Sequence, residues 1–206
     1  MTYQTELFDS MIGDINSLSG RPDLADETQL ALRTATNNAH FCDAFPRDLV
    51  TTSVQLPNAS YLTQLDLPTQ FPKLRGLSQL RPLGADYQPV NLPLDQQIKI
   101  IELGDIYDDY GAVKTNIAYL AGDKINIRSL HNSYGFIVDW YKAPLVRREE
   151  YNSWIAQLYP DVIVYWAASI VLDISGNEEK ATKLMKQVQS VCLPYLKSNF
   201  LLGELR

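Results

Sequence analysis

The spacing of apolar residues changes twice along this chain, from a helical repeat to a strand repeat and back to a helical repeat. Over residues 4–19, apolar side chains recur every three or four positions, which predicts a first helix. A second helix is predicted from Asp26, a candidate N-cap, to Phe45, because Pro46 cannot continue it. Two helices therefore precede the first change of period.

From residue 47 apolar and polar residues alternate, which is the repeat of a half-buried strand. Pro57–Asn58 is typical of a turn, and residues 61–67 read as a second extended piece. Five prolines over residues 68–93 then favour a long irregular segment. These features predict a β-rich region with an irregular excursion inside it.

The clearest strand signal is a three-stranded meander over residues 116–141, with turns at Gly122–Asp123 and around Asn132–Ser133. In its last strand Phe136, Val138 and Trp140 share one face, and Ile137 and Tyr141 share the other. Apolar residues on both faces predict a strand that is covered on both sides.

Helical spacing returns after Pro144 in three consecutive segments, predicted at residues 147–158, at residues 161–174, and from an N-cap at Asn177 to Pro194. The middle segment is apolar nearly all round, so we expect it to be the central buried helix. Gly176 is placed to end that helix in a left-handed conformation.

This order predicts an α+β fold. A discontinuous helical bundle is expected from residues 1–46 and 144–206, and an inserted antiparallel β domain from residues 47–143, including the irregular stretch at 68–93. At 206 residues, the chain is long enough for one domain with an insertion.

Residues with chemical potential are few and scattered. His40 lies in a predicted helix and His131 lies beside a predicted turn, and neither accompanies a nucleophile motif. The glycines form no loop for cradling phosphate, so we expect no nucleotide cofactor. Cys42 and Cys192 suit two buried thiols, since a bridge between them would require neighbouring helices. We therefore expect no enzyme, no cofactor and no metal.

Glu102, Asp105, Asp108 and Asp109 crowd the segment ELGDIYDDYG. Three interpretations remain open: a solvated loop, a functional acidic surface, and a calcium or magnesium site, although the spacing matches no EF-hand. The net charge of −6 argues against an ordinary grip on nucleic acid, which needs clustered Lys and Arg.

No signal peptide is visible, and the longest uncharged apolar stretch, residues 162–172, is too short to span a bilayer, so we expect a soluble chain and no membrane partner. Twelve tyrosines and three tryptophans suit either a core or protein interfaces. The tail is also too apolar for an idle terminus. Candidate subunit or partner interface residues are Trp140, Tyr141, Phe200, Leu201, Leu202 and Leu205.

Two long segments carry a resemblance. They are ALRTATNNAH followed by FPRDLV, and YNSWIAQLYPDVIVYWAASIVLDISGNEEKATKLMKQV. In these segments, and in the order of its elements, the chain resembles the head-to-tail adaptor, or connector, proteins of tailed bacteriophages, especially short-tailed phages. The resemblance implies a helical domain from both chain ends, an inserted β domain, and a dodecameric ring beneath the portal.

The function that the resemblance implies is a structural virion protein of the neck, assembled in the host bacterial cytoplasm. Its expected partners are further copies of itself, the portal protein, tail nozzle or tail fibre proteins, and DNA that passes through the channel without sequence-specific binding. An acidic chain suits such a channel because it does not grip phosphate. The alternative is a carbohydrate- or ligand-binding module that uses the aromatic strand from Tyr134 to Trp140.

Overall fold

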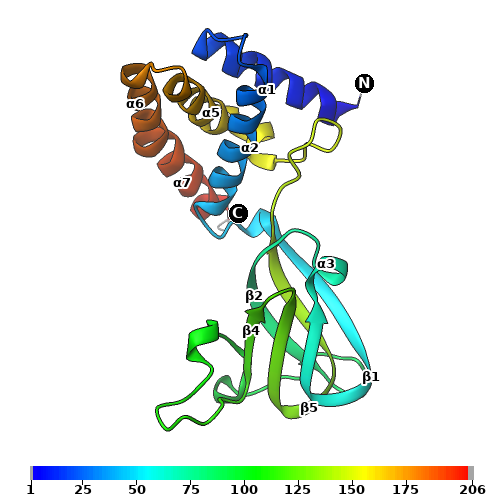
Figure 1. Cartoon of the computed structure of the whole chain (residues 1–206). Helices are drawn as coiled ribbons and strands as arrows, with labels where there is room; N and C mark the ends of the chain where they lie inside the picture. The colour runs from blue at the N-terminus through cyan, green and yellow to red at the C-terminus, as the bar shows by residue number, and fades with distance from the viewer. Residues whose placement is uncertain (1, 204–206) are drawn as a thin grey trace. The chain divides into compact units, whose positions relative to one another are not determined.

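The computed structural model describes residues 2–203, and their side chains except those of Pro68 and residues 199–203. The predicted α+β class is confirmed, since helices from both ends pack together and a mostly antiparallel sheet is inserted between them. The chain forms two compact units (Figure 1). They are a helical unit, residues 1–47 with 144–206, and a β unit, residues 48–143.

Two N-terminal helices open the helical unit, α1 (Tyr3–Ser19) and α2 (Ala25–Phe41). The predicted N-cap of α2 was wrong, because Leu24 occupies that position and offers no side-chain acceptor. Asp26 lies instead in the first turn, where the helix dipole favours an acidic residue. The predicted end at Phe45 was also wrong, since α2 ends four residues earlier and a short turn, η1 (Pro46–Asp48), follows.

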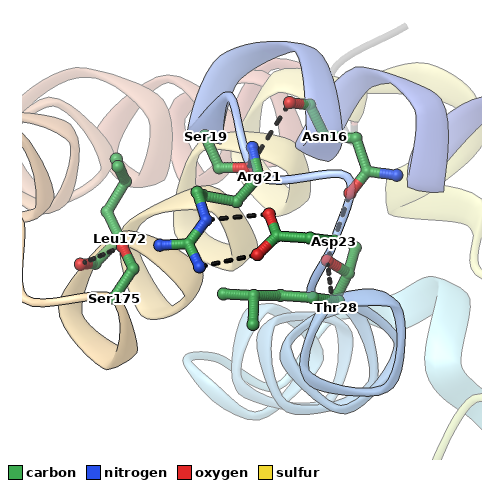
Figure 2. Close-up of polar contacts among 8 residues, drawn as sticks. Asn16, Ser19, Arg21, Asp23, Thr28, Leu172 and Ser175 are labelled. Atoms are coloured by element: carbon green, nitrogen blue, oxygen red, sulfur yellow. Dashed lines mark hydrogen bonds and ion pairs between the residues drawn. The ribbon is translucent and has the colours of Figure 1, made fainter.

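Figure 2 shows the polar contacts that fix the corner between α1 and α2. The Thr28 hydroxyl shares its one proton between the Leu24 carbonyl, at 2.7 Å, and the Asn16 side-chain oxygen, at 3.2 Å. Arg21 and Asp23 form a two-bond ion pair across the connecting loop. The corner is therefore held by bonds from both helices and from the loop.

The C-terminal half of the helical unit begins with α4 (Trp154–Leu158) and α5 (Pro160–Ile174). The helix predicted over residues 147–158 forms only in its last turn and a half. Its cap is Ser153, whose hydroxyl accepts from the Ala156 N–H, and the residues before it are occupied by a turn from Arg147 to Glu150. The predicted central helix is confirmed, because α5 packs on α1, α2, α4 and α6 (Glu178–Gln187).

The turn between α5 and α6 follows the sequence prediction closely. Gly176 has a φ of 77° and donates to the Asp173 carbonyl, while Asn177 donates to the Leu172 carbonyl. These two bonds form a Schellman motif, in which a left-handed glycine satisfies the last carbonyls of the helix. The Asn177 side chain also caps α6 by accepting from Lys180.

The predicted helix end at Pro194 was wrong. A π turn, η4 (Val188–Cys192), follows α6 and leads directly into α7 (Leu193–Gly203). In this wider turn the Leu193 N–H bonds to the Val188 carbonyl, five residues back. Pro194 then falls in the first turn of α7, where its missing N–H is tolerated.

The core of the helical unit is apolar with a few paired polar groups. Met11, Ile15, Leu32 and Ile163 are among its fully covered side chains. The Tyr151 hydroxyl bonds Thr36 at 3.0 Å, inside the core. Burial raises the pKa of this phenol to about 12, against the lowering effect of hydrogen bonds with Thr36 and Ser153.

The two cysteines lie on this core. Cys192 is buried, as expected, and its burial raises the pKa of the thiol. Cys42 is only half-buried, and its Sγ donates to the Ala39 carbonyl at 3.1 Å.

The β unit is built around one long strand, β5 (Lys124–Lys142). On one side it pairs over its length with β1 (Leu49–Asp66), and on the other side with β4 (Ile117–Ala121) and then β2 (Leu74–Leu83). A two-residue strand, β3 (Lys99–Ile100), pairs in parallel with β4. Short helical turns occur at α3 (Leu67–Gln70), η2 (Leu94–Gln96) and η3 (Leu103–Asp105).

The Gly122–Asp123 turn is confirmed, since Ala121 pairs with Lys124 around it. The turns predicted at Pro57–Asn58 and at Asn132–Ser133 were wrong, because β1 and β5 both run through them. These polar segments lie opposite each other at an irregular stretch, where the register between β1 and β5 shifts twice. A bulge of this kind bends paired strands without reversing them.

The bend also changes which residues of β5 face the core. Ile125 and Ile127 are buried before it, whereas Phe136 and Val138 are buried after it. Gly135 lies just past the bend, and a Cβ at this position would overlap the carbonyl oxygen of Val54. The close approach of β1 and β5 therefore requires glycine here.

The irregular segment predicted at residues 68–93 was partly wrong, because β2 lies within it. Pro82 lacks an N–H but fits in β2, because β2 pairs with β5 along only one of its edges. The Pro82 carbonyl still accepts from the Val90 N–H. Phe71 packs edge-on against Trp140, with the ring centroids 5.8 Å apart, in the core of the β unit.

We predict that Gly135→Ala destabilises the β unit by about 1 to 3 kcal/mol, because the added methyl group forces the β1 and β5 backbones apart. Gly76→Ala in β2 is the matched control, since a Cβ there meets no atom within 4 Å. Denaturant unfolding of the two variants measures the difference. Equal stability of both would contradict this account of the bend.

We also predict a specific alkaline loss of stability from Tyr151. The folded-state pKa of about 12 lies above the unfolded value near 10, so the unfolded chain ionises first and stability falls as pH rises between these values. The contribution of this group is about 1.4 kcal/mol per pH unit. The free energy of unfolding of wild type should therefore exceed that of Tyr151→Phe by less at pH 11 than at pH 9. An equal difference at both pH values would refute the assignment.

Candidate assembly surfaces

A groove lies between α5 and α6 on the surface of the helical unit. It has a volume of about 440 Å³, and its apolar floor contains Ile170, Ala181 and Met185. Polar side chains of Ser169, Asp173, Thr182, Lys186 and Gln189 complete the lining. The groove is large enough to receive side chains from another protein, in the range of pockets that bury small ligands.

The groove arises from small residues and from the tight α5–α6 turn. Ala181 fills little of the space between the helices, and the Ser169 hydroxyl folds back to donate to the Trp166 carbonyl at 2.7 Å. The Ser175 hydroxyl likewise donates to Leu172 at the end of α5 (Figure 2). The Ser169 hydroxyl of the groove lining is therefore already satisfied by the backbone of its own helix.

A ridge stands on the outer face of α2. We define the α2 ridge as Asp26, Leu30 and Arg33, which are spaced four and three residues apart and all lie on the exposed side of the helix. Leu30 is 57% exposed although most apolar residues of α2 are buried. An apolar side chain flanked by an acid and a base is the pattern of an anchor residue with a polar rim.

Four charged side chains on the ridge and in the groove form no ion pair with the side chains that the structure describes. Among residues 2–203, Asp26, Arg33, Asp173 and Lys186 take part in no salt bridge. By contrast, Lys183, on the same helix as Lys186, pairs with Glu179 at 2.6 Å. The unpaired charges are therefore available to an outside partner.

The β unit exposes large apolar side chains along the segment that connects β2 to β4. Leu94, Leu103, Tyr107 and Tyr110 are all exposed, and Tyr110 is 95% exposed. The green loop that extends from the sheet in Figure 1 belongs to this segment. Exposed aromatic residues on a loop are typical of protein contact sites.

The acidic segment belongs to the same loop. The Asp108 carboxylate accepts from the backbone N–H groups of Tyr110 and Ala112, at 2.9 and 2.8 Å, so it organises a turn around Gly111. Within the part of the chain that the structure describes, no cluster of three or more His, Cys, Asp or Glu side chains is arranged to hold a metal ion.

A second hollow, of about 590 Å³, lies on the β unit between β1, β5 and Val113. Its lining mixes apolar and polar side chains, and Gln64 bonds Asn126 across the strands at 2.9 Å. The Thr63 hydroxyl beneath it is buried with no hydrogen-bond partner among the described residues. Because this hydroxyl is covered by protein, it does not reach a ligand in the hollow.

The predicted interface residues lie in different environments. Trp140 is 2% exposed and its indole N–H donates to Thr52 at 2.9 Å, so it offers no surface to a partner. Of the other aromatic residues on this strand, Phe136 is buried, whereas Tyr134 is half-buried with its ring centroid 6.5 Å from that of Tyr87. Tyr141 is half-buried, with the Arg75 guanidinium 5.0 Å from its ring centre.

The other predicted interface residues belong to the tail. The backbone of Phe200, Leu201 and Leu202 continues α7, but their side chains lie outside the described ones, and Leu205 lies outside the described residues. The sequence interpretation missed the α2 ridge and the groove. Leu30 was the sequence signal for the ridge, because it is apolar but lies off the helix face that carries the buried residues Leu32, Ala35 and Ala39.

The two histidines have structural partners. His40 is buried and its Nε2 lies 2.9 Å from the Ser153 hydroxyl, the group that caps α4. His131 is exposed and its Nε2 lies 2.9 Å from the Gln96 side-chain oxygen. Each ring is therefore engaged in holding its own unit together.

No family model matches the chain, and no curated protein matches it. Among the helices that the structure describes, none is both long enough and apolar enough to cross a membrane.

We predict that millimolar Ca²⁺ or Mg²⁺ leaves the thermal unfolding midpoint unchanged. The Asp108 carboxylate is already engaged by backbone donors, and binding to the folded state alone would raise the midpoint. Differential scanning fluorimetry with and without chelator is the measurement. A reproducible rise with either ion would revive the metal interpretation of residues 102–109.

Proposed function

We propose that this chain is the subunit of a head-to-tail adaptor ring in the neck of a tailed bacteriophage. The observation that carries the proposal is the discontinuous helical unit, in which α1 and α2 pack on α5 while the β unit is inserted between them. This is the arrangement implied by the resemblance of residues 31–50 and 151–188 to adaptor proteins.

The surfaces of the subunit support this proposal. A ring of identical copies needs two different contact surfaces on each copy, because every subunit touches one neighbour with each side. The helical unit has an exposed ridge on α2 and a groove between α5 and α6. An active-site cleft is not required for such a role.

The charge of the chain suits the proposed channel. Its 24 acidic residues exceed its 18 basic residues, and the acidic segment around Asp108 is exposed. DNA binds proteins mainly through Lys and Arg on its phosphates, so an acidic lining favours sliding over retention. DNA is therefore proposed to traverse the ring without sequence-specific contacts.

We assign the helical unit to ring formation and to the portal contact. The β unit, with Leu94, Tyr107 and Tyr110 exposed on its long loop, is assigned to docking of tail nozzle or tail fibre proteins. The protein then resides in the neck of the virion, after assembly in the host bacterial cytoplasm.

Electron microscopy of the purified protein mixed with portal rings from the same virus tests the proposal. We expect twelve copies to form a collar on one face of the portal ring, with native mass spectrometry giving the stoichiometry. A Tyr107→Ser, Tyr110→Ser variant should form the same collar but fail to recruit tail components. A protein that never joins the portal as a ring would count decisively against the proposal.

A further inference from the structure

We propose that the α2 ridge of one subunit binds the α5–α6 groove of the next copy of this chain. The inference deepens the adaptor proposal, since it names the surfaces through which the ring closes. It rests on three matching features of the two surfaces: an apolar centre, opposite charges on either side of it, and a similar spacing between those charges.

The first matching feature is apolar: a side chain on the ridge and the floor of the groove. Leu30 projects from the α2 ridge and is largely exposed, whereas Ile170, Ala181 and Met185 form an apolar floor with an open side. A leucine entering a groove between two helices is the ordinary way in which helical ridges and grooves pack. Met185 adapts readily to such a side chain because methionine is unbranched and flexible.

The charges match in sign. Along α2 the sequence is acid, leucine, base, at Asp26, Leu30 and Arg33. The groove lining likewise supplies an acid, an apolar floor and a base, with Asp173 near the end of α5 and Lys186 in the last turn of α6. Arg33 therefore pairs with Asp173, and Asp26 pairs with Lys186, when Leu30 enters the centre.

The spacing of the charges agrees as well. Asp26 and Arg33 are seven residues apart, about 10 Å along a helix. Asp173 lies beside the turn that joins α5 to α6, and Lys186 lies eight residues beyond the first residue of α6, about 12 Å along that helix. The two helical rises are of the same order, as the proposed docking of both charge pairs requires.

The contact joins two different surfaces, so it is heterologous. A copy that inserts its ridge into one neighbour keeps its own groove open for another, and repeated contacts of this kind close into a ring when the rotation between copies allows it. A symmetric dimer would use both surfaces at once and stop at two subunits. The ridge and groove thus provide the geometry that a ring requires.

Charge reversal and rescue test this contact in the full-length protein. Arg33→Glu and Asp173→Lys should each weaken self-association by at least about tenfold, because each places like charges against each other in every interface. The double variant R33E/D173K restores opposite charges and should recover assembly. Lys180→Glu, an exposed reversal outside the groove lining, is the matched control and should assemble like wild type.

Truncation of the anchor gives an independent measurement. Leu30→Ala should reduce assembly, whereas Leu158→Ala, at a site of similar exposure, should not. Circular dichroism and thermal unfolding of each variant establish that the monomers remain folded. Sedimentation velocity and native mass spectrometry at rising concentration, with and without portal rings, report the assembly state.

Each outcome bears on the inference. Loss with either reversal and recovery in the double variant support it. Normal assembly of the single variants, or no recovery in the double variant, overturns it while the adaptor proposal stands. Variants that still form rings but no longer bind portal rings would show that the groove binds the portal protein. That result would overturn the proposal that a second copy of this chain occupies the groove.

The adaptor proposal can also fail while the ridge–groove contact stands. Head-to-tail oligomers that depend on Arg33 and Asp173 but never form a ring on the portal would retain the interface and reject the adaptor function. A wild-type chain that stays monomeric with and without portal rings would overturn both.

Discussion

The burial of α5 is the constraint on which the helical unit depends. A helix that is so largely apolar must be covered over most of its surface by neighbouring helices, and in α5 only a part that includes Ile170, Asp173 and Ile174 stays open. Its cover comes from α1 and α2 at one end of the chain and from α4 and α6 next to it in sequence. Because the two groups of helices must meet, everything between residues 48 and 143 has to leave the helical unit and return to it.

The parts of the fold that depend on local chemistry could be predicted from the sequence. The Gly176 cap, the Asn177 cap and the Gly122–Asp123 turn were all correctly placed, because each needs a residue type that few other positions tolerate. The periodic helices α1 and α5 were also predicted within one residue at each end. In these elements local preference and tertiary packing favour the same structure.

Several errors lie where the backbone absorbs a residue that favours a break, or where a contact joins distant parts of the chain. Pro57, Asn132 and Pro194 all favour breaks locally, yet a β bulge or a π turn absorbs each of them. Gly135 carried no recognisable signal, because its role depends on the carbonyl of Val54, eighty-one positions earlier. The candidate assembly surfaces were missed for a similar reason, since a groove exists only once two helices have packed. Trp140 is an error of the opposite kind. It was predicted as an interface residue, but it is buried in the core of the β unit.

The discontinuous helical unit also has a consequence for the order in which the nascent protein can fold. The five strands that the structure describes lie between residues 49 and 142, so the β unit has these strands before α5 has been synthesised. Phe8, Met11 and Ile15, by contrast, have no central helix to pack on until residue 174 has left the ribosome. Protein domains generally fold as units during synthesis. During that interval the apolar faces of α1 and α2 depend on each other, or on a chaperone, for protection from water.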